Sequence, residues 1–98
     1  MSLEFHPDAD EELAEAALHY DRELEGLGNR FAAEVRRATD LLGEHPHIGQ
    51  RLDDQLSRLI LRRFPYSLIY AVDQDSIFVL AVAHHRRRPG YWRSRLDC

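Results

Sequence analysis

Lysine is absent from this sequence: all 13 basic residues are arginine, and 17 acidic residues leave a net charge of −4. A net negative charge excludes a general nucleic-acid coat protein, which binds phosphates through a surplus of positive charge. Cysteine is almost as scarce, because Cys98, the last residue, is the only one. An internal disulfide is therefore excluded, and a nucleophile at the end of a chain would be poorly positioned.

Long apolar runs are missing as well. No stretch approaches the ~20 residues that a membrane helix needs, and residues 1–4 lack the basic and then apolar profile of an export signal. We therefore expect a cytoplasmic protein without membrane association. A Ser-His-Asp motif, a glycine-rich phosphate loop and a CxxC pair are absent too. The 98 residues predict one domain spanning residues 1–98.

Two stretches in the first half have the period of amphipathic helices. Apolar side chains recur at intervals of three and four over residues 8–25 and predict a helix there, with Pro7 tolerated at its start. Asn29 is the expected N-cap of a second helix, which Gly43 would close in the left-handed conformation. A connection this short predicts an antiparallel two-helix hairpin.

The second half has the character of β-structure. Branched and aromatic residues dominate residues 59–64, 67–72 and 77–83, which predict a three-stranded antiparallel meander after a loop over residues 44–56. The last two strands are apolar on both faces, so we expect cover on both sides, from the chain itself or from a partner on one side. With a short N-terminal strand over residues 3–6 and a short C-terminal turn, the expected fold class is α+β.

Positive charge concentrates in the second half, because residues 1–50 carry a net charge of −8 and residues 51–98 a net charge of +4. By the two-residue period of a strand, Arg58 and Arg62 share one side. If the end of the last strand adjoins theirs, the arginines merge into one anion-binding patch with Tyr66, Tyr91 and Trp92 as stacking surfaces. Otherwise they form a solvated rim. The candidate target- or anion-binding residues are Arg58, Arg62, Arg63, Arg86, Arg87, Arg88 and Trp92.

The pair His84 and His85 offers proton chemistry near neutral pH. Adjacent residues of a strand point to opposite faces, so one imidazole should face the core or the helices and the other should face solvent. The same geometry argues against a shared metal ion, and His45 and His47 have no third ligand at an obvious spacing. We therefore expect no metal and no cofactor.

Ribonuclease chemistry is one alternative for these side chains. Without a metal it needs a base for the 2′-hydroxyl proton, a cation for the phosphorane and an acid for the departing oxygen. The candidate catalytic residues of the right types are Arg62, Arg63, Arg86, Tyr91, His84 and His85. The same residue types are common in structural positions, so the list alone does not establish catalysis.

Five short segments, in this order and at these separations, make the chain resemble the RelE/ParE superfamily of type II toxins. They are FHPDA at 5–9, LGNRF at 27–31, PHIG at 46–49, RFPY at 63–66 and VLAVAH at 79–84. The resemblance covers nearly the whole chain, and residues 84–92 are similar to members labelled plasmid stabilisation proteins. It implies a growth-inhibiting toxin that a cognate antitoxin neutralises by laying an extended or helical arm along it, for which the hairpin and the apolar strands leave a groove.

The resemblance also implies one of two targets. ParE-like members poison DNA gyrase and have no established catalytic residues, whereas RelE-like members enter the ribosomal A site and cut messenger RNA, usually with basic residues and a late Tyr. The net negative charge, the missing lysines and the long hairpin favour gyrase, while Arg62, Arg86 and Tyr91 keep the ribosome-dependent ribonuclease open. A non-toxic protein-binding module is a third interpretation. A homodimer and a toxin-antitoxin hetero-oligomer are the assemblies considered.

Overall fold

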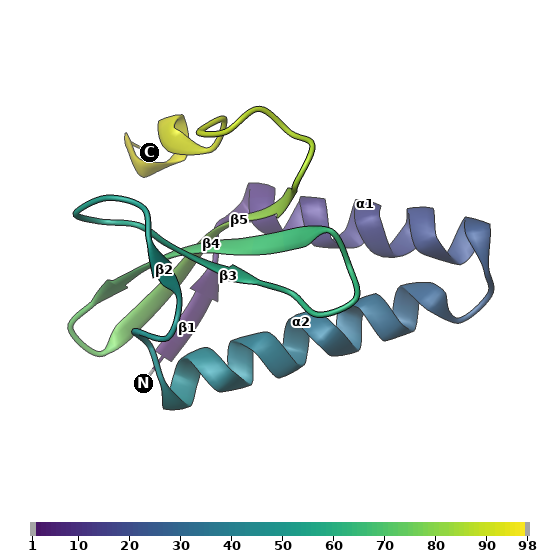
Figure 1. Cartoon of the computed structure of the whole chain (residues 1–98), viewed down its shortest axis with the longest axis horizontal. Helices are drawn as coiled ribbons and strands as arrows, with labels where there is room; N and C mark the ends of the chain where they lie inside the picture. Colours follow the sequence, from purple (N-terminus) through teal and green to yellow (C-terminus); the bar gives the residue numbers. More distant parts are fainter. Residues whose placement is uncertain (1, 98) are drawn as a thin grey trace.

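One five-stranded sheet lies between a helix hairpin and the C-terminal segment (Figure 1). The computed structural model describes residues 2–97, so Cys98 lies outside the described residues. In chain order the elements are β1 (Ser2–Phe5), α1 (Pro7–Glu23), α2 (Leu27–Glu44), β2 (Gln50–Arg51), β3 (Ser57–Ile60), β4 (Tyr66–Asp73), β5 (Ser76–His84) and a 3-10 turn, η1 (Arg93–Asp97). The strand order is β1-β5-β4-β3-β2, in which only the β1–β5 pair is parallel among the described strands. The predicted α+β class, hairpin and meander are confirmed.

Helix α1 begins as its sequence signals predict. Pro7 occupies the first turn, where its missing N–H is no loss. The imidazole Nδ1 of His6 accepts a hydrogen bond from the Asp8 N–H at 3.0 Å, which satisfies one of the free donors at the start of the helix. Acidic residues in this first turn interact favourably with the helix dipole.

The connection between the helices differs from the prediction. Gly26 has a φ of 89°, in the left-handed region that glycine adopts without strain, and α2 begins directly after it at Leu27. The prediction that Asn29 is the N-cap is therefore wrong. Gly43 lies inside α2, which continues to Glu44, so its predicted role in closing the helix is wrong as well.

The two helices approach each other closely at Gly28. Its N–H donates a hydrogen bond to the Asp21 carboxylate at 2.8 Å, and a Cβ at this position would overlap the carbonyl oxygen of Ala17. Glycine is required here by the space between the helices and not by its backbone angles.

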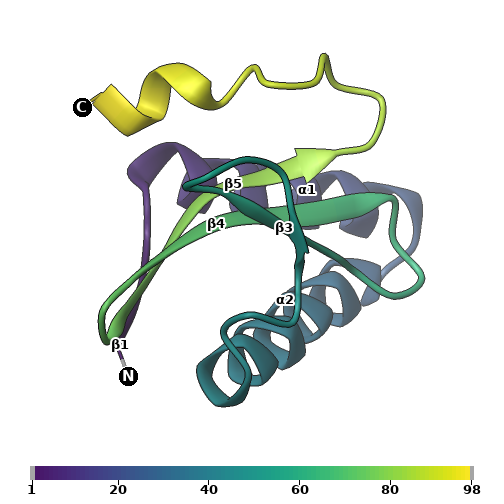
Figure 2. The same ribbon diagram turned by 60° about the vertical axis from the view of Figure 1, so that its left-hand side comes forward.

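The two faces of the sheet carry separate apolar cores, which we call the helix-side core and the C-terminal-side core. The helix-side core contains Ala9, Ala16, Phe31, Val35, Ala38, Leu42, Leu61, Leu68, Tyr70, Ile77, Val79 and Val82. The C-terminal-side core contains Leu56, Ile69, Leu80, Ala81, Ala83 and Trp92. Figure 2 shows the C-terminal segment lying across the sheet on the side opposite α2. The chain itself therefore covers both faces of β4 and β5, the first of the two predicted arrangements.

A bulge in β5 adjusts which side chains reach each core. Ile69 pairs with Ala81 and Tyr70 pairs with Val79, so Leu80 is an extra residue on β5. Leu80 and Ala81 consequently both contribute to the C-terminal-side core, although they are adjacent in sequence. A strict two-residue alternation does not predict this.

The first strand of the meander is shorter than predicted. It ends at Ile60, and residues 61–65 form a tight turn in which Arg63 has a φ of 66°. A left-handed residue breaks the strand geometry, so the prediction of a strand over residues 59–64 is wrong beyond Ile60. The two-residue strand β2 falls inside the predicted loop. Among the described residues, no helix has the length and apolar character needed to cross a membrane.

Candidate functional site

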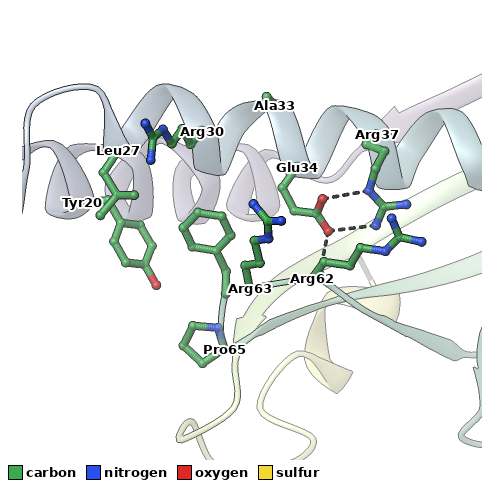
Figure 3. A pocket seen from close by; sticks show the side chains of 10 residues that line it. Tyr20, Leu27, Arg30, Ala33, Glu34, Arg37, Arg62, Arg63 and Pro65 are labelled. Atoms are coloured by element: carbon green, nitrogen blue, oxygen red, sulfur yellow. Dashed lines mark hydrogen bonds and ion pairs between the residues drawn. The ribbon is translucent and has the colours of Figure 1, made fainter.

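An open trough runs between α2 and the turn that joins β3 to β4 (Figure 3). It has a volume of about 660 Å³, and both apolar and arginine side chains line it. The lining residues are Tyr20, Leu27, Arg30, Ala33, Glu34, Arg37, Arg62, Arg63, Phe64 and Pro65. On α2 the contributing residues lie at intervals of three and four, so a single face of the helix presents them to the trough.

Aromatic rings form the apolar part of the trough and of the core behind it. The ring centroids of Tyr20 and Phe64 lie 5.1 Å apart, those of Phe31 and Phe64 5.2 Å apart, and those of Phe31 and Tyr66 4.9 Å apart. These edge-to-face contacts are favourable beyond the area that they bury. Because Phe31 is fully buried, the cluster fixes the β3–β4 turn against the hairpin.

Glu34 is the acidic residue among the lining residues of the trough. Its carboxylate accepts hydrogen bonds from Nε and Nη2 of Arg37, both at 2.8 Å, and from the backbone N–H of Arg62 at 2.6 Å. The hydrogen bond from Arg37, the bond from the Arg62 N–H and the charges of both arginines outweigh the effect of burial and lower the pKa of Glu34. The ionised carboxylate therefore holds the turn against α2.

Three guanidinium groups in the trough are available to a partner. Across residues 2–97, the side chains of Arg30, Arg62 and Arg63 take part in no hydrogen bond or ion pair. Arg63 reaches the trough from a left-handed backbone position, which for a residue other than glycine costs about 1 kcal/mol. An arginine thus occupies a strained position where glycine would be favoured, and strain of this kind clusters at functional sites.

A smaller hollow of about 230 Å³ lies between α1 and the end of β5, and we call it the α1–β5 hollow. Its lining residues are Glu12, Glu15, Ala16, His19, Tyr66, Val82, His84 and Arg87. The rings of His84 and Tyr66 meet edge to face with centroids 4.9 Å apart, and Nδ1 of His84 accepts a hydrogen bond from the Arg86 N–H at 3.0 Å. The pKa of His84 is lowered, mainly by burial and to a smaller extent by the charges of Arg86, His85 and His19. The neutral imidazole is therefore favoured in this hollow.

The two adjacent histidines face opposite sides of the sheet, as predicted. His84 lines the hollow on the helix side, whereas Nε2 of His85 lies 2.9 Å from Oγ of Ser67 on the other face. Ser67 pairs with Ala83, which belongs to the C-terminal-side core. Within residues 2–97, no group of three or more His, Cys, Asp or Glu residues is placed to hold a metal ion.

Tyr91 has a partner inside the protein. Its hydroxyl donates a hydrogen bond to Oε2 of Glu12 at 2.6 Å, and the guanidinium of Arg87 lies 4.0 Å from the centroid of its ring. Burial and the hydrogen bond to Glu12 raise the pKa of Tyr91 well above its usual value. The tyrosine is therefore held as a neutral hydrogen-bond donor to Glu12.

The candidate ribonuclease residues do not converge on one hollow. Arg62 lines the trough, His84 lines the α1–β5 hollow, and no lining residue is common to the two. His85 lies on the opposite face of the sheet, and the hydroxyl of Tyr91 is bonded to Glu12. Arg86 is exposed just beyond the end of β5.

The arginines of the predicted anion-binding patch do not lie on one surface either. Arg58 does not share a side with Arg62: it pairs with Ile69 of the C-terminal-side core, and its Nη2 donates to Oε1 of Gln50 at 2.8 Å. The prediction of a shared side is wrong because the strand ends before Arg62. The prediction that Trp92 offers a stacking surface is also wrong, because its side chain lies in the C-terminal-side core with 8% exposure.

Of the remaining arginines of that patch, Arg63 lines the trough, whereas Arg86, Arg87 and Arg88 do not. The His85 N–H donates to the carbonyl oxygen of Pro65 at 2.8 Å, so the end of β5 adjoins the β3–β4 turn. Arg86, Arg87 and Arg88 follow as exposed residues, of which Arg87 lines the α1–β5 hollow.

Two groups of residues that these sites contain were not predicted from the sequence. The first group lies in the acidic half of the chain, where the net negative charge drew attention away from individual arginines: Arg30, Glu34 and Arg37. Their spacing of four and three residues places them on one helix face, and this pattern could have identified them from the sequence. Glu12 and Arg95 meet across 83 positions of sequence, and no local pattern pairs them.

Comparisons with known proteins agree with this architecture. The family model described as "ParE toxin of type II toxin-antitoxin system, parDE" matches residues 3–89. Among solved structures, "Chromosomal ParDE TA system from P. aeruginosa" is similar with a TM-score of 0.75 and 19% sequence identity, over 86% of this chain and 95% of that chain. A search of curated proteins returns no match. Because the family match spans the whole hairpin and strands β2 to β5, the chain belongs to the ParE toxin family of type II toxin-antitoxin systems.

Proposed function

We propose that this toxin inhibits DNA gyrase and that a cognate antitoxin neutralises it by filling the trough. Two observations support gyrase over the ribosome: the family match over residues 3–89, and the separation of the candidate ribonuclease residues between two hollows and the opposite sheet face. An inhibitor that binds its target needs no convergent acid and base. The protein would act in the cytoplasm, and its module would stabilise a plasmid that carries it.

The chemistry of the trough supports an acidic, partly apolar protein segment as its occupant. Guanidinium groups bind carboxylates through bidentate hydrogen bonds, as Arg37 binds Glu34 inside the trough. The aromatic wall suits a bulky apolar side chain better than a phosphate backbone. A segment from gyrase would use the trough in the free toxin, and the antitoxin would compete for it.

The activity is tested with purified gyrase and relaxed plasmid. We expect the protein to inhibit supercoiling, and Arg30→Ala with Arg63→Ala to raise the half-inhibitory concentration at least about tenfold, because two of the three guanidinium charges at the trough that are unpaired within residues 2–97 are lost. Arg36→Ala is the matched control, since Arg36 is exposed on the same helix and does not line the trough. Normal supercoiling at saturating toxin would contradict the proposed target.

The partnership is tested by co-expression with the product of the reading frame beside this gene, where the proposal places a small antitoxin. We expect the two to co-purify, and the charge reversal Arg30→Glu with Arg63→Glu to release the partner, while Arg36→Glu retains it. Retention of the partner by the double reversal would contradict its placement in the trough. Growth that is unimpaired by tightly controlled expression of the toxin alone would instead favour the non-toxic binding module.

A ribosome-dependent ribonuclease is the second candidate, and the α1–β5 hollow is the observation that favours it. The hollow combines a neutral imidazole at His84 with a phenol at Tyr66 and a cation at Arg87. Under this alternative, purified protein would cut messenger RNA on ribosomes, and His84→Ala, Arg86→Ala or Tyr91→Ala would abolish cutting. Cutting of messenger RNA together with normal supercoiling would replace gyrase by the ribosome as the target.

A further inference from the structure

Residues 90–97, which we call the C-terminal strap, cover one face of the sheet without joining it. Within the described chain, the backbone hydrogen bonds of this segment are local: Tyr91 N–H to Arg88 O at 3.3 Å, Arg93 N–H to Gly90 O at 3.0 Å and Arg95 N–H to Trp92 O at 2.9 Å. Attachment to the rest of the protein therefore depends on side chains. The whole strap also lies beyond the family match, which ends at residue 89.

The main polar attachment is a cluster around Glu12 on α1, which we call the Glu12 clasp. From the strap, Arg95 donates to both carboxylate oxygens, with Nη1 to Oε1 at 2.9 Å and Nη2 to Oε2 at 3.0 Å, and Tyr91 donates its hydroxyl proton. The side chains of Glu12 and Arg95 are 14% and 13% exposed, so the pair is largely shielded from water. Such charge-assisted bonds are stronger than neutral ones.

The Glu12 clasp also completes the edge of β5. Strand β1 accompanies β5 only from Ser76 to Val79, which leaves the following backbone groups on that edge without a neighbouring strand. The Val82 N–H donates to Oε1 of Glu12 at 3.0 Å, and the Leu80 carbonyl accepts from Nη1 of Arg95 at 3.0 Å. One carboxylate thus joins the helix, the strand edge and the strap.

The remaining attachments are less complete. Trp92 is the buried apolar side chain of the strap, and Tyr91 and Leu96 pack against the same core. Across residues 2–97, however, the buried Nε1–H of Trp92 has no hydrogen-bond partner. An unsatisfied buried donor is unfavourable. Arg93 pairs with Asp53 at 2.6 Å, but these side chains are 54% and 34% exposed, where ion pairs contribute little. The residues just before Gly90 are exposed, and Gly90 itself has a φ of 83°, in the left-handed region.

We propose that the C-terminal strap is a hinged cover that opens as a unit while the helices and sheet stay folded, and that the Glu12 clasp keeps it closed. Opening separates side-chain contacts only, whereas unfolding of the hairpin breaks helix backbone bonds and the helix-side core. Segments with few backbone bonds to the rest of a protein open at lower free energy than its core. The open form exposes the apolar side chains of the C-terminal-side core.

The only tryptophan in the chain, Trp92, reports this opening directly. In a urea titration, we expect the emission of Trp92 to shift to the red at a lower urea concentration than the loss of the far-UV circular dichroism of the helices. In Glu12→Gln the gap should widen, because the opening equilibrium rises about 10- to 100-fold when the charge-assisted bonds are lost. Arg95→Gln, which changes the strap side of the clasp, should act in the same direction.

Glu15→Gln is the matched control. Glu15 lies one helical turn from Glu12, lines the same hollow and makes no hydrogen bond or ion pair to the strap among the described residues. Its substitution should leave both transitions where they are in the wild type. Coincident fluorescence and circular dichroism transitions in the wild type and in Glu12→Gln would overturn the proposal, and so would equal shifts in Glu12→Gln and Glu15→Gln. None of these measurements depends on gyrase or on an antitoxin.

Discussion

The two faces of the sheet are covered in physically different ways. The helix-side core is closed by α1 and α2, whose backbone groups are satisfied within each helix, so the hairpin packs as a rigid layer. The C-terminal-side core is closed by an irregular segment that is held by side chains. Its buried donors Nε of Arg58 and Nε1 of Trp92 have no partner among the described residues. Opening the C-terminal side of the sheet should therefore cost less free energy than opening the helix side.

The largest loss of stability is expected when the helix-side core is emptied. Phe31 is fully buried and contacts the rings of Tyr20, Phe64 and Tyr66. We expect Phe31→Ala to lower the free energy of unfolding by about 3–5 kcal/mol, because it leaves a cavity at the centre of this cluster. Chemical denaturation measures this loss. A loss below about 1 kcal/mol would show that the helix side is not the rigid half.

A substitution at the contact between α1 and α2 should also destabilise the helix side of the sheet. Gly28→Ala places a methyl group against the Ala17 carbonyl, so the helices must separate, and we expect a loss of about 1–3 kcal/mol in the free energy of unfolding. Gly43→Ala is the control, because a Cβ there meets no atom within 4 Å and glycine in a helix is itself unfavourable. Its thermal midpoint should rise or stay the same. Equal losses in the two variants would contradict the close approach.

The trough allows stability and function to be separated at one residue. Arg63→Gly removes the strain of a left-handed arginine, so we expect the free energy of unfolding to rise by about 0.5–1 kcal/mol. The same change removes a guanidinium from the trough, so inhibition of supercoiling should weaken. Arg63→Ala keeps most of the strain and loses the charge, and should weaken inhibition without stabilising the fold. Full inhibition by both variants would contradict a role for Arg63 in binding.

The smallest expected effect is an acid response at Asp53, whose carboxylate pairs with Arg93 of the C-terminal strap. Hydrogen bonds from Arg93 and from the N–H groups of Gln55 and Leu56 lower the pKa of Asp53 to about 2. A lowered pKa stabilises the fold above the ordinary value of 3.8, and this contribution is lost as the pH falls through about 2. We therefore expect part of the acid-induced change in Trp92 fluorescence to disappear in Asp53→Asn.

Asp54→Asn is the control for that measurement. The neighbouring Asp54 is exposed, and among residues 2–97 its side chain makes no hydrogen bond or ion pair, whereas its backbone carbonyl accepts a hydrogen bond from Arg51. The Glu12 clasp should also lose stability as the pH falls, because the pKa of Glu12 is lowered too. Burial raises the pKa of Glu12, but the hydrogen bonds from Arg95, Tyr91 and the Val82 N–H together lower it below its ordinary value. The clasp therefore persists at neutral pH and weakens only in acid. A fluorescence change that is identical in Asp53→Asn and the wild type would contradict the assignment to Asp53.

Local patterns predicted the elements of this protein well, because helices and strands are specified by periodicity over a few residues. The hairpin, the meander and the opposed directions of His84 and His85 follow from spacing alone. Family membership was equally visible in short segments that extend from residue 5 to residue 84, and the family match over residues 3–89 confirms it.

The tertiary structure decided which of these residues meet. Arg30 and Arg37 of α2 share the trough with Arg62 and Arg63 because a left-handed residue at position 63 turns the chain back under the helix. Trp92 is buried because the C-terminal segment lies across the face of the sheet opposite α2 (Figure 2), where Arg95 is bonded to Glu12. Contacts between residues so distant in sequence leave no periodic trace, since they depend on how whole elements pack.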